Sequence, residues 1–358
     1  MPSRHPITIT ITITITITIT ITITITISKG TMMTQTNHTI IRKLAALGAA
    51  ALLLSSTACS AHGNASANTD TDTMRVAYLS TANYLTTLKN EQFAQDELAP
   101  ATVEFTGPYN PADARTAVQS GNADATSTGT GSFINLIAQD QPWVAFAIEY
   151  YDGDSQGIVA APDSGVETLE DLYGKTIAID SKGATGDYIV HQAFANAGLD
   201  ASQVTEVEMS PSNFNAAFSS GQVDAIATFD QNLASAMVTP GAKLLVNAED
   251  YGNLNVSIHI VSQSFADKHP DLVKAMYRAL VKESDKAQEH PEIITDAYRE
   301  FGASDEIVDQ VAKFDVPEIL PIDADGLDML ERQAQQYVDF GFIDAMPDVK
   351  SHVMDCTE

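Results

Sequence analysis

The chain has 358 residues, a formal net charge of −28 at pH 7 and only two cysteines. So acidic a protein repels nucleic acid and anionic membrane surfaces, and we therefore expect neither as a binding partner. With so few cysteines the chain must fold on its hydrophobic core rather than on disulfides, and its length is sufficient for two lobes.

Residues 40–58 have the organisation of a secretory signal. The basic residues Arg42 and Lys43 precede an apolar run from Leu44 to Leu54, and small residues then lead to Cys59. The run is about half as long as a helix that crosses a hydrocarbon core of roughly 30 Å. We therefore predict a signal peptide at residues 32–58 that is removed on export, not a membrane span.

Cys59 resembles the cysteine of the lipobox in bacterial lipoproteins, which is acylated and becomes the first mature residue. That family usually places Leu three residues before the cysteine, whereas this chain has Ser56 there and Leu54 two positions further back. The alternative is an ordinary signal peptide cleaved near Ala58. We predict lipidation at Cys59, which would anchor the exported protein to the outer face of the cell membrane.

Isoleucine and threonine alternate from Ile7 to Ile27. Period-two alternation of two β-formers is the pattern of a strand and of an aggregation-prone segment. Because a signal peptide follows this tract, we interpret residues 1–31 as a low-complexity extension, translated from a nucleotide repeat upstream of the true start at Met32 or Met33. Residues 1–58 are therefore left out of the fold prediction.

The mature chain is predicted to begin with a flexible tether at residues 59–73. Removing residues 1–58 takes away four basic and no acidic side chains, so the net charge of the remainder is −32. Residues 60–73 contain no large apolar side chain and cannot order themselves by burial. As a random coil they would reach roughly 20 Å.

From Met74 onward, strand-like and helical patterns alternate, which predicts mostly parallel α/β sheets. In the first series we expect strands at 74–79, 102–105, 123–126 and 143–148, and helices at 83–98, 111–121 and 132–139. In the second we expect strands at 157–161, 176–179, 204–209 and 224–228, and helices at 169–173, 186–197 and 213–220. A strand at 257–262 and amphipathic helices over 270–340 complete the chain.

A weak internal repeat supports two lobes of similar construction. Residues 119–125 and 219–225 each combine a helix end, a Gly and an Asp-Ala pair that enters a strand. We predict one lobe from residues 74–160 and 259–358, and a second from residues 161–258. The segments 158–161 and 257–262 are expected to cross between the lobes and to act as hinges.

Several short motifs occur in a fixed order along the mature chain. They are Gly107-Pro108, residues 121–124, the Gly-rich loop 128–132, residues 171–178 (DLYGKTIA), the loop 181–186, residues 197–199 (AGL) and residues 221–225 (GQVDA). In this order the chain resembles the periplasmic binding proteins of ABC importers for nitrate, taurine, aliphatic sulfonates and thiamine precursors, and most of all the sulfonate branch. The resemblance implies an α/β fold of two lobes (type II), with a ligand cleft between them.

In that family, Val-Asp-Ala is often followed by an aromatic residue, commonly Trp, and then by an acidic residue. This chain departs from that pattern. Here the pair is Phe229-Asp230, and phenylalanine lacks the indole N–H donor. Asp230 could pair with an amine on the ligand or could simply be solvated. His259 lies in a strand-like run, and we expect it to be a packed core residue.

The candidate ligand site is formed by loops at the carboxyl ends of strands, where ligands of α/β sheets bind. Small and hydroxyl residues there allow close backbone approach, and helix N-termini offer N–H groups to an anion. Plain helix capping by Ser and Thr is the alternative for each loop. The candidates, including an aromatic wall of Tyr84, Tyr151, Tyr188 and Phe229, are Ser80, Asn83, Tyr84, Thr128, Gly129, Thr130, Gly131, Ser132, Tyr151, Ser181, Ala184, Thr185, Tyr188, Phe229 and Asp230.

The sequence thus predicts a monomeric solute-binding lipoprotein that captures a small anion, such as an aliphatic sulfonate or taurine, and delivers it to the permease of an ABC importer. Import of nitrate or of a thiamine-precursor pyrimidine is the alternative. From other classes, we considered an adhesin and an enzyme like the pyrimidine synthase that shares this fold. That synthase needs a cysteine-rich motif, which Cys59 and Cys356 cannot supply. No catalytic residue, cofactor or metal is predicted.

Overall fold

The computed structural model describes residues 7–15, 19–27 and 72–357 of the chain. The chain divides into two units, Met1–Asn68 and Thr69–Glu358. In the first unit, strands β1 (Ile7–Ile15) and β2 (Ile19–Ile27) pair antiparallel, as the alternation of Ile and Thr indicates. The predicted signal peptide, Cys59 and the tether up to residue 71 lie outside the described residues. No helix among the described residues is long and apolar enough to cross a membrane.

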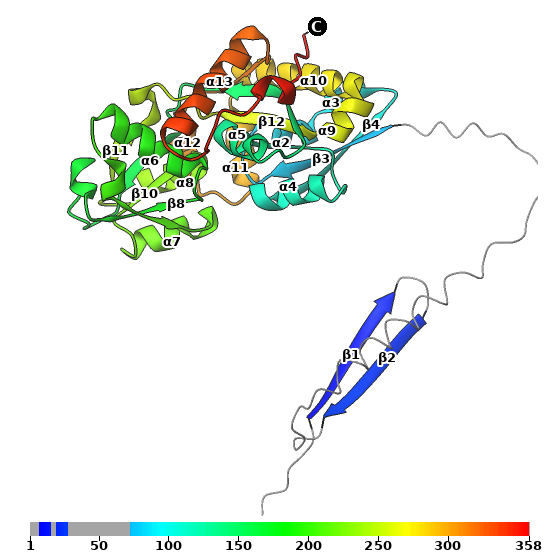
Figure 1. Ribbon diagram of the computed structural model, residues 1–358, viewed down its shortest axis with the longest axis horizontal. Coiled ribbons are helices and arrows are strands. Elements are labelled where there is room, and N and C mark those ends of the chain that lie inside the picture. The colour runs from blue at the N-terminus through cyan, green and yellow to red at the C-terminus, as the bar shows by residue number, and fades with distance from the viewer. Residues whose placement is uncertain (1–6, 16–18, 28–71, 358) are drawn as a thin grey trace, which may run out of the picture. The chain divides into compact units, whose positions relative to one another are not determined.

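The second unit contains two sheets (Figure 1). The first of them has six strands in the order β13-β6-β12-β5-β3-β4. Strand β3 pairs in parallel with β4 and β5, whereas β12 runs antiparallel to both β5 and β6. The strands are β3 (Thr73–Leu79), β4 (Thr102–Tyr109), β5 (Ala125–Gly129), β6 (Trp143–Tyr150), β12 (Ser257–Ser262) and β13 (Glu318–Leu320).

The other sheet has five strands in the order β11-β7-β10-β8-β9. Strand β8 pairs in parallel with β9 and β10, whereas β7 is antiparallel to β10 and β11. The strands therefore run mostly parallel, as expected. In each of these two sheets four strands point the same way, and the exceptions are β7 here and β12 and β13 in the first sheet. The strands are β7 (Gln156–Ala160), β8 (Thr176–Ile179), β9 (Thr205–Glu208), β10 (Ala225–Phe229) and β11 (Lys243–Asn247).

Helices follow the strands in chain order. In the first lobe they are α2 (Tyr84–Thr87), η1 (Leu88–Asn90), α3 (Gln92–Leu98), α4 (Pro111–Gln119) and α5 (Thr130–Ala138). In the second they are η2 (Glu170–Leu172), α6 (Thr185–Asn196), η3 (Ala201–Gln203), η4 (Pro211–Asn213), α7 (Phe214–Ser219), α8 (Asp230–Met237) and η5 (Ala248–Tyr251). The C-terminal part adds α9 (Gln263–Lys268), α10 (Pro270–Glu289), α11 (Glu292–Glu300), α12 (Asp305–Val311), α13 (Ala324–Asp339) and η6 (Val349–His352).

Local sequence accounts for the ends of α4 and for a break in the helix expected at 83–98. The side chain of Asn110 caps α4 by accepting from the N–H of Asp113, and Gly121 follows the helix with φ +74°. By contrast, Glu91 has an extended backbone with φ −109° and ψ 127°, which separates η1 from α3. The expected single helix is therefore three short ones.

The internal repeat seen in the sequence has the same structural role in both lobes. Asp124 accepts a hydrogen bond from the backbone N–H of Arg75 at 2.9 Å, at the start of the first sheet. Asp224 accepts one from the backbone N–H of Thr176 at 2.8 Å in the second. Each carboxylate therefore ties the strand that follows its helix to the neighbouring strand.

The two segments that join the sheets precede the predicted crossings in the chain and are more polar than expected. Residues 151–155 connect β6 to β7, and residues 252–256 lead into β12. The segments 158–161 and 257–262, predicted as crossings, lie largely within β7 and β12, because apolar runs of this length form buried strands. Residues 156–160 accordingly belong to the second sheet rather than the first.

The core lies on both faces of each sheet. On β8, for example, Ile177 and Ile179 face one apolar cluster, whereas Ala178 faces the other. A further cluster joins α8 of the second lobe to the C-terminal helices, through Ala234, Tyr298 and Val311. Figure 1 shows the second lobe in green beside the lobe built from the cyan and the yellow-to-red elements.

Candidate functional site

A cavity of about 400 Å3 lies between the two lobes. Its lining comes from the loops after β3, β4 and β5 of the first lobe and after β8, β9 and β10 of the second, together with both joining segments. These loops stand at the carboxyl ends of the strands, where ligands of open α/β sheets bind. We call this cavity the interlobe cleft.

Most of the residues predicted from the sequence lie in the interlobe cleft. The loop between β5 and α5 and the loop between β8 and α6 face it from opposite lobes, and the aromatic wall is represented by Tyr151 and Phe229. The predicted residues that line it are Asn83, Thr128, Gly129, Ser132, Tyr151, Ser181, Ala184, Thr185, Phe229 and Asp230.

Five of the predicted residues do not line the cleft, and three of these are Tyr84, Tyr188 and Ser80. Tyr84 is buried in the core of the first lobe, where its hydroxyl donates to the carbonyl of Pro317 at 2.5 Å. Tyr188 is also buried and stacks on Tyr337 with ring centroids 5.9 Å apart. Both tyrosines therefore bury an apolar ring in the core rather than form part of the cleft wall. Ser80 is exposed and does not line the cleft.

Thr130 and Gly131, also predicted as ligand residues, instead attach α5 to the returning joining segment. The hydroxyl of Thr130 donates to the carbonyl of Leu254 at 3.2 Å. The backbone N–H of Gly131 donates to Asn255 Oδ1 at 3.0 Å. In the first turn of α5, Thr130 and Gly131 therefore bond to residues 254–255 of the joining segment rather than facing the cleft.

Replacing Gly131 by alanine is expected to destabilise the protein. A Cβ at this position would lie 1.6 Å from the hydroxyl oxygen of Tyr337 and 2.9 Å from Asn255 Oδ1. Overpacking of this kind costs about 3 kcal/mol, measured as the loss in free energy of unfolding by urea denaturation. The same substitution in a Tyr337→Ala background should cost much less, and an equal cost in both backgrounds would contradict this packing.

Arg115, which supplies a positive charge to the lining of the interlobe cleft, was not predicted from the sequence. It lies on α4, one turn after Pro111, which also lines the cleft. The structure gives the guanidinium no hydrogen bond or ion pair with any described residue. Burial lowers the pKa of Arg115, and the nearby charge of Asp180 opposes this. Because a guanidinium stays protonated in proteins, the cleft contains a positive charge that forms no ion pair with a described residue.

Asp180 lies across the cleft from α4, at the end of β8. Its Oδ1 accepts from the N–H of Gly186 in the first turn of α6 at 2.8 Å. Burial raises the pKa of Asp180, and the backbone N–H donors of Gly186 and Ser181 oppose that rise. The carboxylate is thus stabilised by the N-terminus of α6 and, through their opposite charges, by the nearby guanidinium of Arg115.

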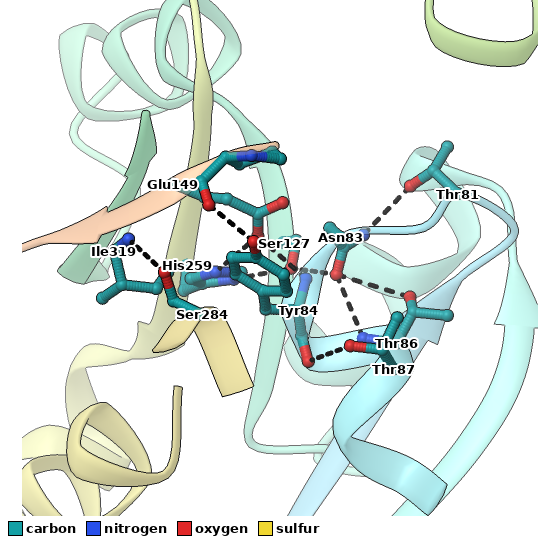
Figure 2. A network of polar contacts seen from close by, with 11 residues as sticks. Thr81, Asn83, Tyr84, Thr86, Thr87, Ser127, Glu149, His259, Ser284 and Ile319 are labelled. Carbon is teal, nitrogen blue, oxygen red and sulfur yellow. Dashed lines mark hydrogen bonds and ion pairs between the residues drawn. The ribbon is translucent and has the colours of Figure 1, made fainter. Parts of the chain in front are cut away.

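A chain of polar contacts underlies the cleft on the first lobe (Figure 2). Asn83 Nδ2 donates to Thr81 Oγ1 at 3.0 Å, and Asn83 Oδ1 accepts from the hydroxyl of Ser127 at 3.1 Å. Ser127 Oγ also lies 2.8 Å from His259 Nδ1, and His259 Nε2 lies 3.0 Å from Glu149 Oε2. His259 is fully buried, as expected, and the contacts fix the orientation of the residues at the surface of the cleft.

The end of the cleft near the joining segments is acidic. Burial raises the pKa of Asp230 to about 7, and the charges of Glu149 and Asp154 add to the rise. Burial also raises the pKa of Tyr151, with a further contribution from Asp230. A smaller cavity of about 70 Å3, lined by Asp230, Glu149 and Tyr298 among others, adjoins this end. Asp230 itself has a left-handed backbone, with φ +50°.

The cleft thus combines a guanidinium at one side, hydroxyl and backbone donors from both lobes, and a carboxyl group that is partly protonated near neutral pH. Such a set can hold a singly charged anion by charge-assisted hydrogen bonds. The carboxyl end can accept hydrogen bonds from a donor on the same molecule.

Comparison with known proteins gives relatives that are named as binding proteins. The chain is 28% identical over 206 residues to a Bacillus subtilis (strain 168) protein whose name assigns it to aliphatic sulfonate binding. The matched residues make up 56% of this chain and 60% of that protein. It is 26% identical over 168 residues to the taurine-binding periplasmic protein of Escherichia coli, covering 46% and 51%. The chain spans about half to three fifths of the length of these relatives.

Solved structures share the fold. The periplasmic aliphatic sulphonate binding protein of Escherichia coli has a TM-score of 0.69 at 19% identity, covering 79% of this chain and 92% of that one. The alkanesulfonate-binding protein of Xanthomonas axonopodis pv. citri, bound to MOPS, has a TM-score of 0.70 at 19% identity, covering 79% and 98%. A desulfurization enzyme also matches, with a TM-score of 0.57 at 17% identity over 79% and 96%.

The family model described as NMT1/THI5 like matches residues 93–294, which is more than half of the chain. The matched range includes the second lobe and much of the first, and therefore most of the loops that line the interlobe cleft. The two-lobed architecture of the periplasmic binding proteins agrees with this match. The chain belongs to the NMT1/THI5-like family.

Proposed function

We propose that this protein is a solute-binding lipoprotein of an ABC importer, which captures a small sulfonate in the interlobe cleft and delivers it to the permease. The observation that carries the proposal is the guanidinium of Arg115, which lines the cleft and has no ion-pair partner among the described residues. Arg115 is half-buried, and a partly desolvated charge without an ion pair has a free-energy cost that a bound anion reduces. The named binding functions of the relatives support the same conclusion.

A sulfonate group suits the donors that surround Arg115. Its three oxygens share one negative charge and can accept several hydrogen bonds at once. The hydroxyls of Thr128, Ser132, Ser181 and Thr185 lie in the same cleft, from both lobes. The protein as a whole carries a charge of −28, so the anion must be held by local donors against a repulsive field.

Hydrogen bonds already connect the two lobes beside the cleft, which supports closure of the lobes around a ligand. Asn135 Nδ2 of α5 donates to the carbonyl of Gly183 at 2.5 Å, and the hydroxyl of Tyr188 on α6 donates to Gln336 Oε1 of α13 at 2.9 Å. A ligand that bonds to both lobes favours the closed arrangement by its extra contacts there. Movement about residues 151–155 and 252–256 would then present a new surface to the permease.

Asp230 favours an aminosulfonate such as taurine as a second candidate ligand. An ammonium group near this carboxyl would restore its ionised form and offset its burial. The chemistry is otherwise the same, because the sulfonate end would still bind at Arg115.

We propose no catalytic activity for the cleft. The relatives and the two sulfonate-binding structures are named as binding proteins, whereas the desulfurization enzyme has the lower TM-score. The cysteine among the described residues, Cys356, is buried near the C-terminus and does not line the cleft.

A thermal-shift screen of the purified protein tests the ligand class. The panel contains ethanesulfonate, taurine, nitrate and an aminopyrimidine. A sulfonate at 100 times its dissociation constant should add about 2.7 kcal/mol to the free energy of unfolding, which raises Tm by about 5 °C or more. A shift with the pyrimidine or nitrate alone would assign the protein to another branch, and no shift with any compound would contradict the proposal.

The lipid anchor is tested by replacing Cys59 with alanine. If Cys59 carries the lipid, the wild-type protein made in a bacterial host should fractionate with membranes, and the Cys59→Ala variant should appear in the soluble exported fraction. Cys356→Ala serves as the matched control and should stay with membranes. Membrane association that survives in Cys59→Ala would contradict lipidation at this residue.

A further inference from the structure

A cluster of potential metal ligands lies in the second lobe, between α6 and β9 and beside the loop 181–185. It consists of Asp187 and His191 of α6 and Glu206 of β9, and one ligand atom from each lies within 4.8 Å of the other two. Asp187 and His191 are four residues apart, so they share one face of the helix. His191 Nε2 lies 3.4 Å from Asp187 Oδ1 and 4.0 Å from Glu206 Oε1.

Two oxygens of this cluster are buried without a hydrogen bond. The side chain of Asp187 is fully buried, and that of Glu206 is 6% exposed. Within residues 72–357, no hydrogen-bond donor reaches Asp187 Oδ1 or Glu206 Oε1, although Asp187 Oδ2 accepts from the N–H of Gly183 at 2.6 Å. Burying carboxylate oxygens without partners costs several kcal/mol. Both unpaired oxygens face the imidazole.

Lys182 supplies part of the missing positive charge. Its ammonium contacts Glu206 Oε2 and lies 3.8 Å from Asp187 Oδ1, but its side chain is 58% exposed. A flexible, well-hydrated ammonium can leave the carboxylates at low cost. It therefore competes with a cation at this position rather than excluding one.

The cluster is accessible from solvent. Asp187, His191 and Lys182 line a cavity of about 520 Å3, which differs from the interlobe cleft although Arg115 and parts of the loop 181–184 border both. The rings of Phe340 and Phe342 hold the imidazole of His191, with ring centroids 5.5 and 4.8 Å from it. An ion and a water molecule can therefore reach a pre-oriented histidine.

We propose that Asp187, His191 and Glu206 bind a divalent transition-metal ion, with Zn2+ as the best match. One imidazole nitrogen and two carboxylate oxygens are ligands that Zn2+ accepts, and water from the cavity supplies the fourth. Bonds of 2.0–2.1 Å in a tetrahedron place ligand atoms about 3.3 Å apart. His191 Nε2 and Asp187 Oδ1 are 3.4 Å apart, which agrees with this distance. Glu206 Oε1 lies 4.0 Å from His191 Nε2 and would have to move by less than about 1 Å.

The site would join α6 to β9 at the base of the loop 181–185. That loop supplies Ser181, Ala184 and Thr185 to the interlobe cleft. A bound ion would therefore stabilise the second lobe and the position of its ligand loop, but the site itself does not depend on which solute the cleft binds.

Competition with a chromophoric zinc chelator measures the affinity of the full chain for Zn2+, and metal content after dialysis gives the stoichiometry. We expect one site per chain. His191→Gln and Asp187→Asn should each weaken it about 100-fold, because each removes one of three ligands, whereas Lys182→Met should tighten it about tenfold by removing the competing ammonium. His290→Gln and Lys243→Gln are matched controls, since both residues pair with exposed glutamates elsewhere.

Binding that is equally tight in wild type, His191→Gln and Asp187→Asn would overturn the proposal, as would the absence of any site in wild type. Circular dichroism of each variant shows whether it is folded. Thermal shifts by sulfonates, measured separately on metal-free protein, report the interlobe cleft, so failure of one proposal is distinguishable from failure of the other.

Discussion

Replacing Arg115 by glutamine is expected to weaken binding of a short alkanesulfonate about 100-fold. The guanidinium is the positive charge on the cleft lining that has no partner among the described residues. Loss of charge-assisted hydrogen bonds to an anion costs about 3 kcal/mol in all, which corresponds to about two powers of ten in the dissociation constant. Isothermal titration calorimetry of both proteins under the same conditions measures the ratio.

The matched control is Arg299→Gln, because Arg299 is exposed and pairs with Asp296 on the surface of α11. Its affinity for the sulfonate should equal that of wild type. The Arg115→Gln variant should be at least as stable as wild type without ligand, since the partial desolvation of a charge without an ion pair is relieved. A change of less than threefold in sulfonate affinity would show that Arg115 is not the anion-binding group.

Replacing Asp230 by asparagine is expected to stabilise the protein at alkaline pH and to have no such effect at pH 4. The pKa of Asp230 is raised from 3.8 to about 7, so the folded chain keeps a proton that the unfolded chain loses between these values. Stability contributed by this proton is complete below pH 4 and is lost as pH rises through 7. Above pH 7, the uncharged asparagine should therefore recover as much as about 4 kcal/mol.

Urea unfolding of the wild type and the variant at pH 4, 6 and 8 measures this difference. Asp140→Asn is the control, because Asp140 is exposed and has a similar left-handed backbone, with φ +55°. It reports any gain that comes from the preference of asparagine for this conformation. A gain for Asp230→Asn that does not change with pH would contradict the raised pKa.

The same group should separate the two candidate ligands. As Asp230 ionises between pH 6 and 8, its charge repels an alkanesulfonate, so that affinity should fall with pH in wild type and stay level in Asp230→Asn. An aminosulfonate carries an ammonium group, and its affinity should rise over the same range in wild type. Calorimetry at both pH values gives the sign for each ligand.

The sequence was sufficient to predict the bounds of strands whose apolar residues form a short run between turn residues. Strands β8 and β12 have the predicted bounds, because their buried residues are contiguous in the chain. Helix α8 and strand β11 were not predicted, since each is short and only partly buried. The direction of β7 depends on how the chain passes between lobes, and no local pattern encodes it.

In the candidate site, too, residues with a local sequence pattern could be predicted, whereas those that depend on the arrangement of distant elements could not. The loops rich in Gly, Ser and Thr could be predicted because small residues before a helix have a local meaning. Arg115 could not, because its importance comes from the placement of α4 over the cleft. Tyr84 and Tyr188 were assigned to the cleft since an aromatic side chain near a polar loop has the same sequence signature whether it faces the ligand or the core.

A crystal structure of the protein with ethanesulfonate tests the central claim most directly. The proposal predicts the sulfonate in the interlobe cleft, with at least one oxygen within hydrogen-bond distance of the Arg115 guanidinium and others at donors of the loops 128–132 and 181–185. A sulfonate bound away from Arg115, or a cleft without sulfonate at saturating concentration, would contradict it.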